Sequence, residues 1–186
     1  QYQEKDPELR KKILSIRPFA SKTYANDLTV KAILELSKEP FFNELSFSII
    51  GDGPLFDEVT EPLKKFDNVR LEKKFLNQQE IVEEHKKHGV FLVPTRMDTQ
   101  GVSRGEAMAS GLVAITNRVA AIPEFCSEED TVLVAKDNYK ELYLKILEVY
   151  LDKNLYKKIA KNGSKRVFNQ SVYNKTFYQI SLLISK

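Results

Sequence analysis

Two carboxylates stand on either side of a glycine near the middle of the chain. Asp98 precedes Gly101, Glu106 follows it, and seven residues separate the two carboxylates. Glycine allows a tight backbone turn, and the amides of Val102 and Ser103 are then expected to open a helix whose positive end attracts anions. A carboxylate one turn inside that helix suits a vicinal diol such as that of a ribose. The structural alternative makes Asp98 a loop cap and Glu106 a residue of the helix surface.

Two cations form a second candidate group. Arg17 and Lys22 follow the first apolar run of the chain, with four residues between them. Arginine supplies a planar set of donors and lysine a mobile point charge, and together they can neutralise a diphosphate without a metal ion. The alternative interpretation is two solvated loop cations. It is less favoured if the anion-binding helix end lies at the same edge of the sheet.

The elements that must position these residues are short and alternate in type. Apolar runs predict six strands, and amphipathic patterns between them predict four helices. The strands span residues 13–16, 46–50, 69–72, 90–93, 112–116 and 131–134, and the helices span 28–38, 55–66, 78–87 and 103–110. This alternation predicts an α/β fold with a Rossmann-like, doubly wound parallel sheet, which binds ligands beyond the carboxyl ends of its strands.

The ends of the chain differ from this middle part. Residues 1–10 are polar and are interpreted as a linker or interdomain segment, and residues 11–186 as one domain. From about residue 138 two or three helices are expected as a C-terminal extension, with Gly163 near a helix end or bend. The first residue is Gln1 rather than Met, which indicates a piece of a longer polypeptide or a processed product.

Composition excludes several classes of function. The net charge of +3 does not indicate a nucleic-acid partner, and no apolar run approaches the length of a membrane span. The single cysteine, Cys126, favours a cytoplasmic location. Ten basic and three acidic side chains follow residue 138, and a solvated helical face is favoured over a membrane-surface patch. His85 and His88 are expected to be solvated rather than metal ligands, and no metal site is predicted.

Four motifs, in their order along the chain, resemble the retaining glycosyltransferases of the GT-B fold, the group that includes sucrose synthase and bacterial glycogen synthase. The resemblance covers residues 12 to about 168 and is to the C-terminal, donor-binding domain of those enzymes. The motifs are Arg17 with Lys22, Gly-Asp-Gly-Pro at 51–54, Asp98 with Glu-Ala-Met-Ala-Ser-Gly at 106–111, and Ala-Ala-Ile-Pro-Glu at 120–124.

The resemblance implies a role for each site residue. Arg17 and Lys22 hold the diphosphate of a nucleotide sugar, Glu106 the ribose hydroxyls, and Asp98 the donor sugar. Further donor-binding positions are Gly51 and Gly53, Phe75 and Leu76 as a nucleobase wall, and the backbone of Gly101, Val102 and Ser103. The family usually has Glu where Asp98 stands, and because Asp is one methylene shorter, the contact with the sugar is expected to be altered or bridged by water.

The resemblance also implies an activity. A hexose passes from a UDP- or GDP-sugar, with UDP favoured, to a glycan or lipid-linked acceptor, as in cell-surface polysaccharide synthesis, without a cofactor or a required metal. An N-terminal domain of the same polypeptide holds the acceptor, so this chain alone is expected to be inactive. The location is cytoplasmic, with peripheral membrane association at the inner face as an option. The alternatives are a nucleotide-sugar epimerase of the same architecture and a non-catalytic nucleotide-sugar-binding module.

Overall fold

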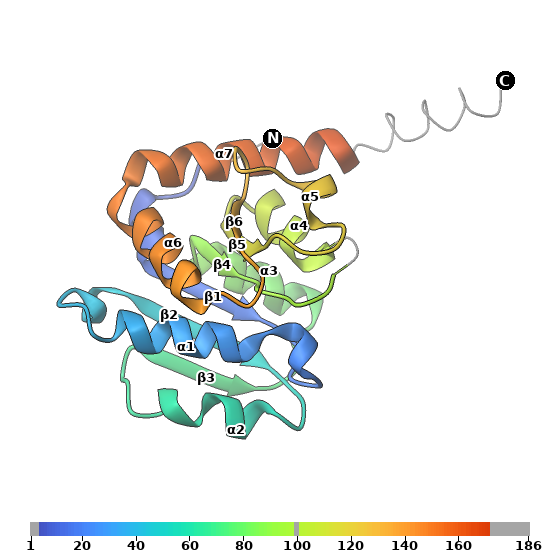
Figure 1. The fold of residues 1–186 in the computed structure, drawn as a ribbon. Coiled ribbons are helices and arrows are strands. Elements are labelled where there is room, and N and C mark those ends of the chain that lie inside the picture. The colour runs from blue at the N-terminus through green and yellow to red at the C-terminus, as the bar shows by residue number, and fades with distance from the viewer. Residues whose placement is uncertain (1–3, 99–100, 172–186) are drawn as a thin grey trace, which may run out of the picture.

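The computed structural model of the protein describes residues 4–98 and 101–171. In this part of the chain, six parallel strands form one sheet in the order β3-β2-β1-β4-β5-β6 (Figure 1). The strands are β1 Lys12–Ile16, β2 Ser46–Gly51, β3 Val69–Lys73, β4 Val90–Leu92, β5 Val113–Asn117 and β6 Val132–Val134. The order changes direction between β1 and β4, as in doubly wound sheets, so the predicted fold class is confirmed.

Helices connect and cover the strands (Figure 1). The α-helices are α1 Asn26–Leu36, α2 Phe56–Thr60, α3 Gln78–Lys87, α4 Val102–Ala109, α5 Ile122–Phe125, α6 Tyr139–Leu151 and α7 Lys153–Ser171. Shorter 3-10 helices are η1 Pro7–Lys11, η2 Lys22–Tyr24, η3 Phe42–Glu44 and η4 Glu61–Leu63. The single helix predicted over 55–66 is instead α2 followed by η4, because Pro62 lacks the amide that would continue an α-helix. None of the described helices has the length and apolar character required to span a membrane.

The sheet divides the hydrophobic core into two layers. Successive side chains of a strand point to opposite faces, so Ile13 packs in the larger cluster with α1 and α6, whereas Leu14 packs in a second cluster with Ala107 of α4. Both residues are fully buried. Burial on both faces explains why the strands read as continuous apolar runs rather than as alternating patterns.

The two ends of the described chain fold back onto this sheet. Arg10 donates from Nε to the carbonyl of Tyr150 at 2.9 Å, and Lys5 donates from Nζ to the carbonyl of His85 at 2.5 Å. The assignment of residues 1–10 as an interdomain segment stays a prediction, but from Pro7 to Lys11 the backbone is a 3-10 helix that contacts the domain.

The prediction for Gly163 was wrong. This glycine lies inside α7, which runs without a break from Lys153 to Ser171. A Cβ atom at position 163 would lie 2.8 Å from the carbonyl oxygen of Asp130. The glycine therefore permits close packing of α7 against the loop before β6, rather than ending a helix.

The prediction that His85 and His88 are solvated was also wrong. The exposed fractions are 3% for His85, in the last turn of α3, and 5% for His88, which caps the C-terminal end of this helix. His85 Nδ1 lies 3.1 Å from Ser110 Oγ, and His88 Nε2 lies 3.0 Å from Ser48 Oγ. Burial lowers the pKa of both imidazoles, and that of His85 falls from 6.5 to about 4, with a smaller contribution from Lys5.

Acid should therefore destabilise the protein in the window between about pH 6.5 and pH 4. The unfolded chain binds a proton at His85 below its ordinary pKa, but the folded chain does not until about pH 4. The stabilisation is complete above pH 6.5, and up to about 3 kcal/mol is lost as the pH falls, at about 1.4 kcal/mol for each pKa unit. Urea unfolding at pH 7.5 and pH 5 measures this loss. His85→Gln should reduce it, and an unchanged pH dependence in that variant would contradict the assignment.

Candidate functional site

A cavity of about 670 Å³ opens at the carboxyl edge of the sheet, where the order changes direction between β1 and β4. The loops that leave these two strands and the first turn of α4 line it. The lining residues are Arg17, Pro18, Ser21, Thr23, Tyr24, Met97, Asp98, Gly101, Val102 and Ser103. Five residues proposed from the sequence thus meet in one cleft, although 80 positions separate Arg17 from Met97 in the chain.

Arg17 is the unusual residue of this cleft. Its exposed fraction is 7%, its Nε has no hydrogen-bond partner in the described part of the chain, and its guanidinium lies 5.1 Å from the centre of the Tyr24 ring. Burial lowers the pKa of the guanidinium, and the charge of Asp98 acts in the opposite direction. A buried cation with an unused donor is costly unless an anion pairs with it, so the cleft is suited to an anionic ligand.

The glycine loop at the end of β2 packs directly against the Arg17 loop. A Cβ atom on Gly51 would lie 1.8 Å from the carbonyl oxygen of Arg17, and one on Gly53 would lie 2.3 Å from the carbonyl carbon of Phe19. The amide of Phe19 donates to the carbonyl of Asp52 at 2.7 Å. Both glycines are therefore required by close backbone approach, and a direct contact between them and a ligand stays a prediction.

The turn before α4 forms as the sequence predicts. Gly101 has a φ of 69° and occupies the cap position of α4, and its amide donates to Asp98 Oδ1 at 3.0 Å. Asp98 therefore closes this turn while it also lines the cleft. The cap glycine has no side chain to cover the helix end, which faces the cavity through Val102 and Ser103.

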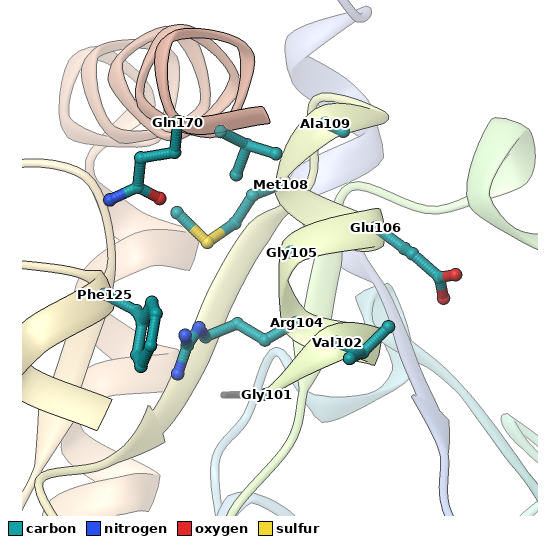
Figure 2. Close-up of a pocket in the computed structure, with 10 residues that line it drawn as sticks. Gly101, Val102, Arg104, Gly105, Glu106, Met108, Ala109, Phe125 and Gln170 are labelled. Carbon is teal, nitrogen blue, oxygen red and sulfur yellow. The ribbon is translucent and has the colours of Figure 1, made fainter. Parts of the chain in front are cut away.

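Glu106 lies one turn further along α4. Figure 2 shows its side chain on the same side of the helix as Val102, whereas Arg104 and Met108 extend toward Phe125 and α7 on the other side. These residues line a second, smaller hollow of about 260 Å³. Glu106 thus flanks the cleft rather than lining it, and its role with a ribose stays a prediction.

The remaining predicted residues lie near the rim or further away. Lys22 is exposed in η2, between Ser21 and Thr23, which line the cleft. Phe75 follows β3 at the edge of the sheet and is 74% exposed, whereas Leu76 is half-buried against the core cluster of α4. The cleft does not include either apolar residue, so their role as a nucleobase wall stays a prediction.

Sequence reasoning missed a polar network beside the cleft. Asp27, in the first turn of α1, accepts two hydrogen bonds from Arg96, at 2.8 and 2.9 Å. The pKa of Asp27 is raised by burial, but the hydrogen bonds and charge of Arg96 outweigh this effect and hold it below its ordinary value. Because 68 residues separate the partners in the sequence, the only available signal was the position of Arg96 in a strand-exit loop.

The architecture recurs in known proteins. A family model described as glycosyl transferases group 1 matches residues 10–152. An uncharacterised glycosyltransferase of Methanocaldococcus jannaschii is 29% identical over 139 residues, which are 72% of this chain and 38% of the relative.

Two solved structures share the fold. The C-terminal domain of a glycosyl transferase group 1 family protein from Francisella tularensis superposes with a TM-score of 0.72 and 22% identity, covering 86% of this chain and 85% of that one. A mutant of S. aureus TarM, solved in complex with fondaparinux, α-GlcNAc-glycerol and UDP, gives a TM-score of 0.78 and 16% identity, covering 96% of this chain and 36% of that one.

The fold is thus that of the C-terminal domain of a GT-B glycosyltransferase. The chain belongs to the glycosyl transferases group 1 family, because the family model spans well over half of its residues. It corresponds to 38% of the length of the curated relative that it matches.

The buried guanidinium yields a prediction about stability. Arg17→Met should leave the free energy of unfolding unchanged or raise it by about 1 kcal/mol, because a buried apolar chain of similar length needs no partner. The matched control is Arg70→Met, which leaves the buried carboxylate of Glu84 without its arginine. That change should cost about 2 kcal/mol. Urea unfolding without ligand measures both values, and equal losses would show that Arg17 is satisfied within the protein.

Proposed function

We propose that this chain is the donor-binding domain of a retaining glycosyltransferase that uses a nucleotide diphosphate sugar, with a UDP-sugar favoured over a GDP-sugar. The buried Arg17 guanidinium, with an unused Nε donor beside the open N-terminus of α4, supports this proposal most directly. A diphosphate carries the negative charge and the acceptor oxygens that would pair with both the Arg17 guanidinium and the N-terminus of α4.

The proposed roles follow from position. Arg17 and Lys22 bind the two phosphates and stabilise the negative charge that develops when the diphosphate leaves. Asp98 and the backbone of residues 101–103 orient the donor sugar at the mouth of the cleft, and Glu106 accepts hydrogen bonds from the ribose hydroxyls. This set of cations requires no metal ion for the departure of the diphosphate.

Efficient transfer requires a second half of the cleft. We propose that another Rossmann-like domain of the same polypeptide, preceding this one, binds a glycan or lipid-linked acceptor for cell-surface polysaccharide synthesis. Holding both substrates together is worth roughly 7 to 11 kcal/mol of the barrier, so the isolated chain should bind the donor without efficient transfer. An epimerase would instead invert the donor sugar, and a non-catalytic module would bind it without turnover.

The two ends of the donor can be tested separately with UDP and uridine. Arg17→Ala combined with Lys22→Ala should abolish the preference of the protein for UDP over uridine, because the cations contact only the phosphates. Glu106→Gln should instead weaken the binding of both ligands by a similar amount, about 1.5 to 3 kcal/mol for a hydrogen bond to a charged group. Calorimetric titration gives the affinities.

The control for this experiment is Lys38→Ala combined with Lys64→Ala, two exposed lysines that lie outside the cleft lining. These changes should leave both affinities unchanged. A wild-type chain that binds neither ligand would contradict the proposed function. Equal loss of UDP and uridine in the Arg17 and Lys22 variant would reject the phosphate role.

We also propose that the protein acts in the cytoplasm, at the inner face of the membrane, which α7 contacts peripherally. Lys158, Lys161 and Lys165 are exposed at helical spacing, followed by Phe168, which is 61% exposed. Within the described residues, none of these three lysines has an ion-pair partner, whereas Lys157 pairs with Glu4. A basic face with an exposed aromatic side chain suits a surface of anionic lipid.

Sedimentation with lipid vesicles tests this contact. The chain should bind vesicles that contain phosphatidylglycerol and not vesicles of phosphatidylcholine alone, and added salt should weaken binding. Replacing the three lysines of α7 with Glu should abolish binding, at about 1 kcal/mol for each lost charge. Glu at Lys38, Lys64 and Lys86 is the control of equal charge. Equal losses in both variants would indicate only net charge and would reject a specific face.

A further inference from the structure

Arg96 connects three loops at the carboxyl edge of the sheet. It leaves β4, and its guanidinium binds both carboxylate oxygens of Asp27 at the start of α1. Nε donates to Asp137 Oδ1 after β6 at 2.6 Å, and Nη1 donates to the carbonyl of Lys22 at 2.6 Å. The side chain therefore links the exits of β1, β4 and β6.

The backbone around Arg96 strengthens the link to the β1 exit. The amide of Arg96 donates to the carbonyl of Thr23 at 2.9 Å, whereas the hydroxyl of Thr95 donates to the carbonyl of Met97 at 2.8 Å and lies further, at 3.3 Å, from the Thr23 oxygen. Two consecutive carbonyls, those of Lys22 and Thr23, are thus held by Arg96, the first by its side chain and the second by its amide. The short η2 helix, which carries Lys22, is fixed against the loop that carries Asp98.

This short helix needs external support. It ends at Ala25, whose φ of 50° lies in the left-handed region that disfavours residues with a Cβ atom. The side chain of Lys22 is exposed and has no ion-pair partner among the described residues, so it does not hold the loop itself. Among the described residues, the bonds from Arg96 are the contacts that fix the carbonyls of this turn to another element.

Arg96 and Arg17 differ in the N–H donors that remain for a ligand. Arginine has five N–H donors, and four hydrogen bonds from the Arg96 guanidinium already engage Asp27, Asp137 and Lys22. Hydrogen bonding to Asp27 raises the pKa of Arg96, whereas burial lowers that of Arg17. Arg96 does not line the cleft, so it is suited to position another group rather than to bind an anion.

We propose that Arg96 is a positioning residue that holds the Lys22 loop in place for the diphosphate without contacting the ligand. The proposal rests on the proposed function, because Lys22 is assigned there to the phosphates. Lysine at position 96 would keep the charge but could not form the two-oxygen contact with Asp27 while also reaching the Lys22 carbonyl. Arg96→Lys is therefore the informative variant.

A double-mutant cycle with UDP and uridine tests this role. Lys22→Ala should reduce UDP affinity about tenfold, the scale of one hydrogen bond to a charged group. Arg96→Lys should cause a loss of similar size, and the double variant should bind UDP no more weakly than Lys22→Ala alone. Uridine affinity should stay unchanged throughout. The control is Arg118→Lys, an exposed arginine after β5 that pairs with Glu128 and should have no effect.

Several results would overturn the proposal. If the two fold-losses of UDP affinity multiply in the double variant, Arg96 acts on the ligand independently of Lys22. Wild-type UDP affinity in Arg96→Lys would mean that the link is dispensable, and an equal loss of uridine affinity would indicate general damage. Thermal unfolding of each variant identifies that last case.

A measurement without ligand separates this proposal from the proposed function. Hydrogen exchange at the amides of Tyr24 and Ala25 should be faster in Arg96→Lys than in Arg118→Lys or wild type, and equal rates would overturn the positioning role. If the wild-type chain binds no UDP, the proposed function fails, and with it the role of Arg96 toward a diphosphate. The exchange rates then still decide whether Arg96 holds the loop.

Discussion

The site depends on keeping one positive charge inside the protein at the end of the central strand. Burying a guanidinium costs several kcal/mol unless partners replace its water, and among the described residues Arg17 has the Tyr24 ring and the Asp98 charge to compensate it. The fold supports this arrangement by packing the glycine loop at the end of β2 directly against the Arg17 backbone. The charge of Arg17 is therefore incompletely compensated within the described part of the chain, and the proposed diphosphate would supply the missing partner.

Backbone strain is concentrated at the same edge of the sheet. Among residues 4–98 and 101–171, three residues with side chains adopt positive φ, namely Ala25, Ala120 and Asp137, and all three lie in loops that leave a strand. Gly53 and Gly101 adopt positive φ in two further strand-exit loops, whereas Gly111 precedes a strand. The opposite edge is thus largely relaxed. Such conformations persist only where surrounding contacts hold them, as Arg96 does for the loop that ends at Ala25.

The sequence predicted what depends on local pattern. Continuous apolar runs located every strand to within one residue at each end, and the rule that ligands bind at strand exits placed Arg17 and Asp98 in one cleft. The failures involve partners that are distant in the chain. His88 bonds to Ser48 across 40 positions, and Gly163 meets Asp130 on another element. A polar residue buried by such contacts has the same local pattern as a solvated one.

The outer strand β3, at one edge of the sheet, has its own consequence. In the described chain β3 pairs only with β2, so one row of its backbone groups is open at the edge. Arg70, Glu72 and Lys73 place charges of both signs along this row. A strand from another molecule would have to bury those charges in order to pair there. The alternating charges of β3 thereby act against edge-to-edge polymerisation at this margin of the sheet.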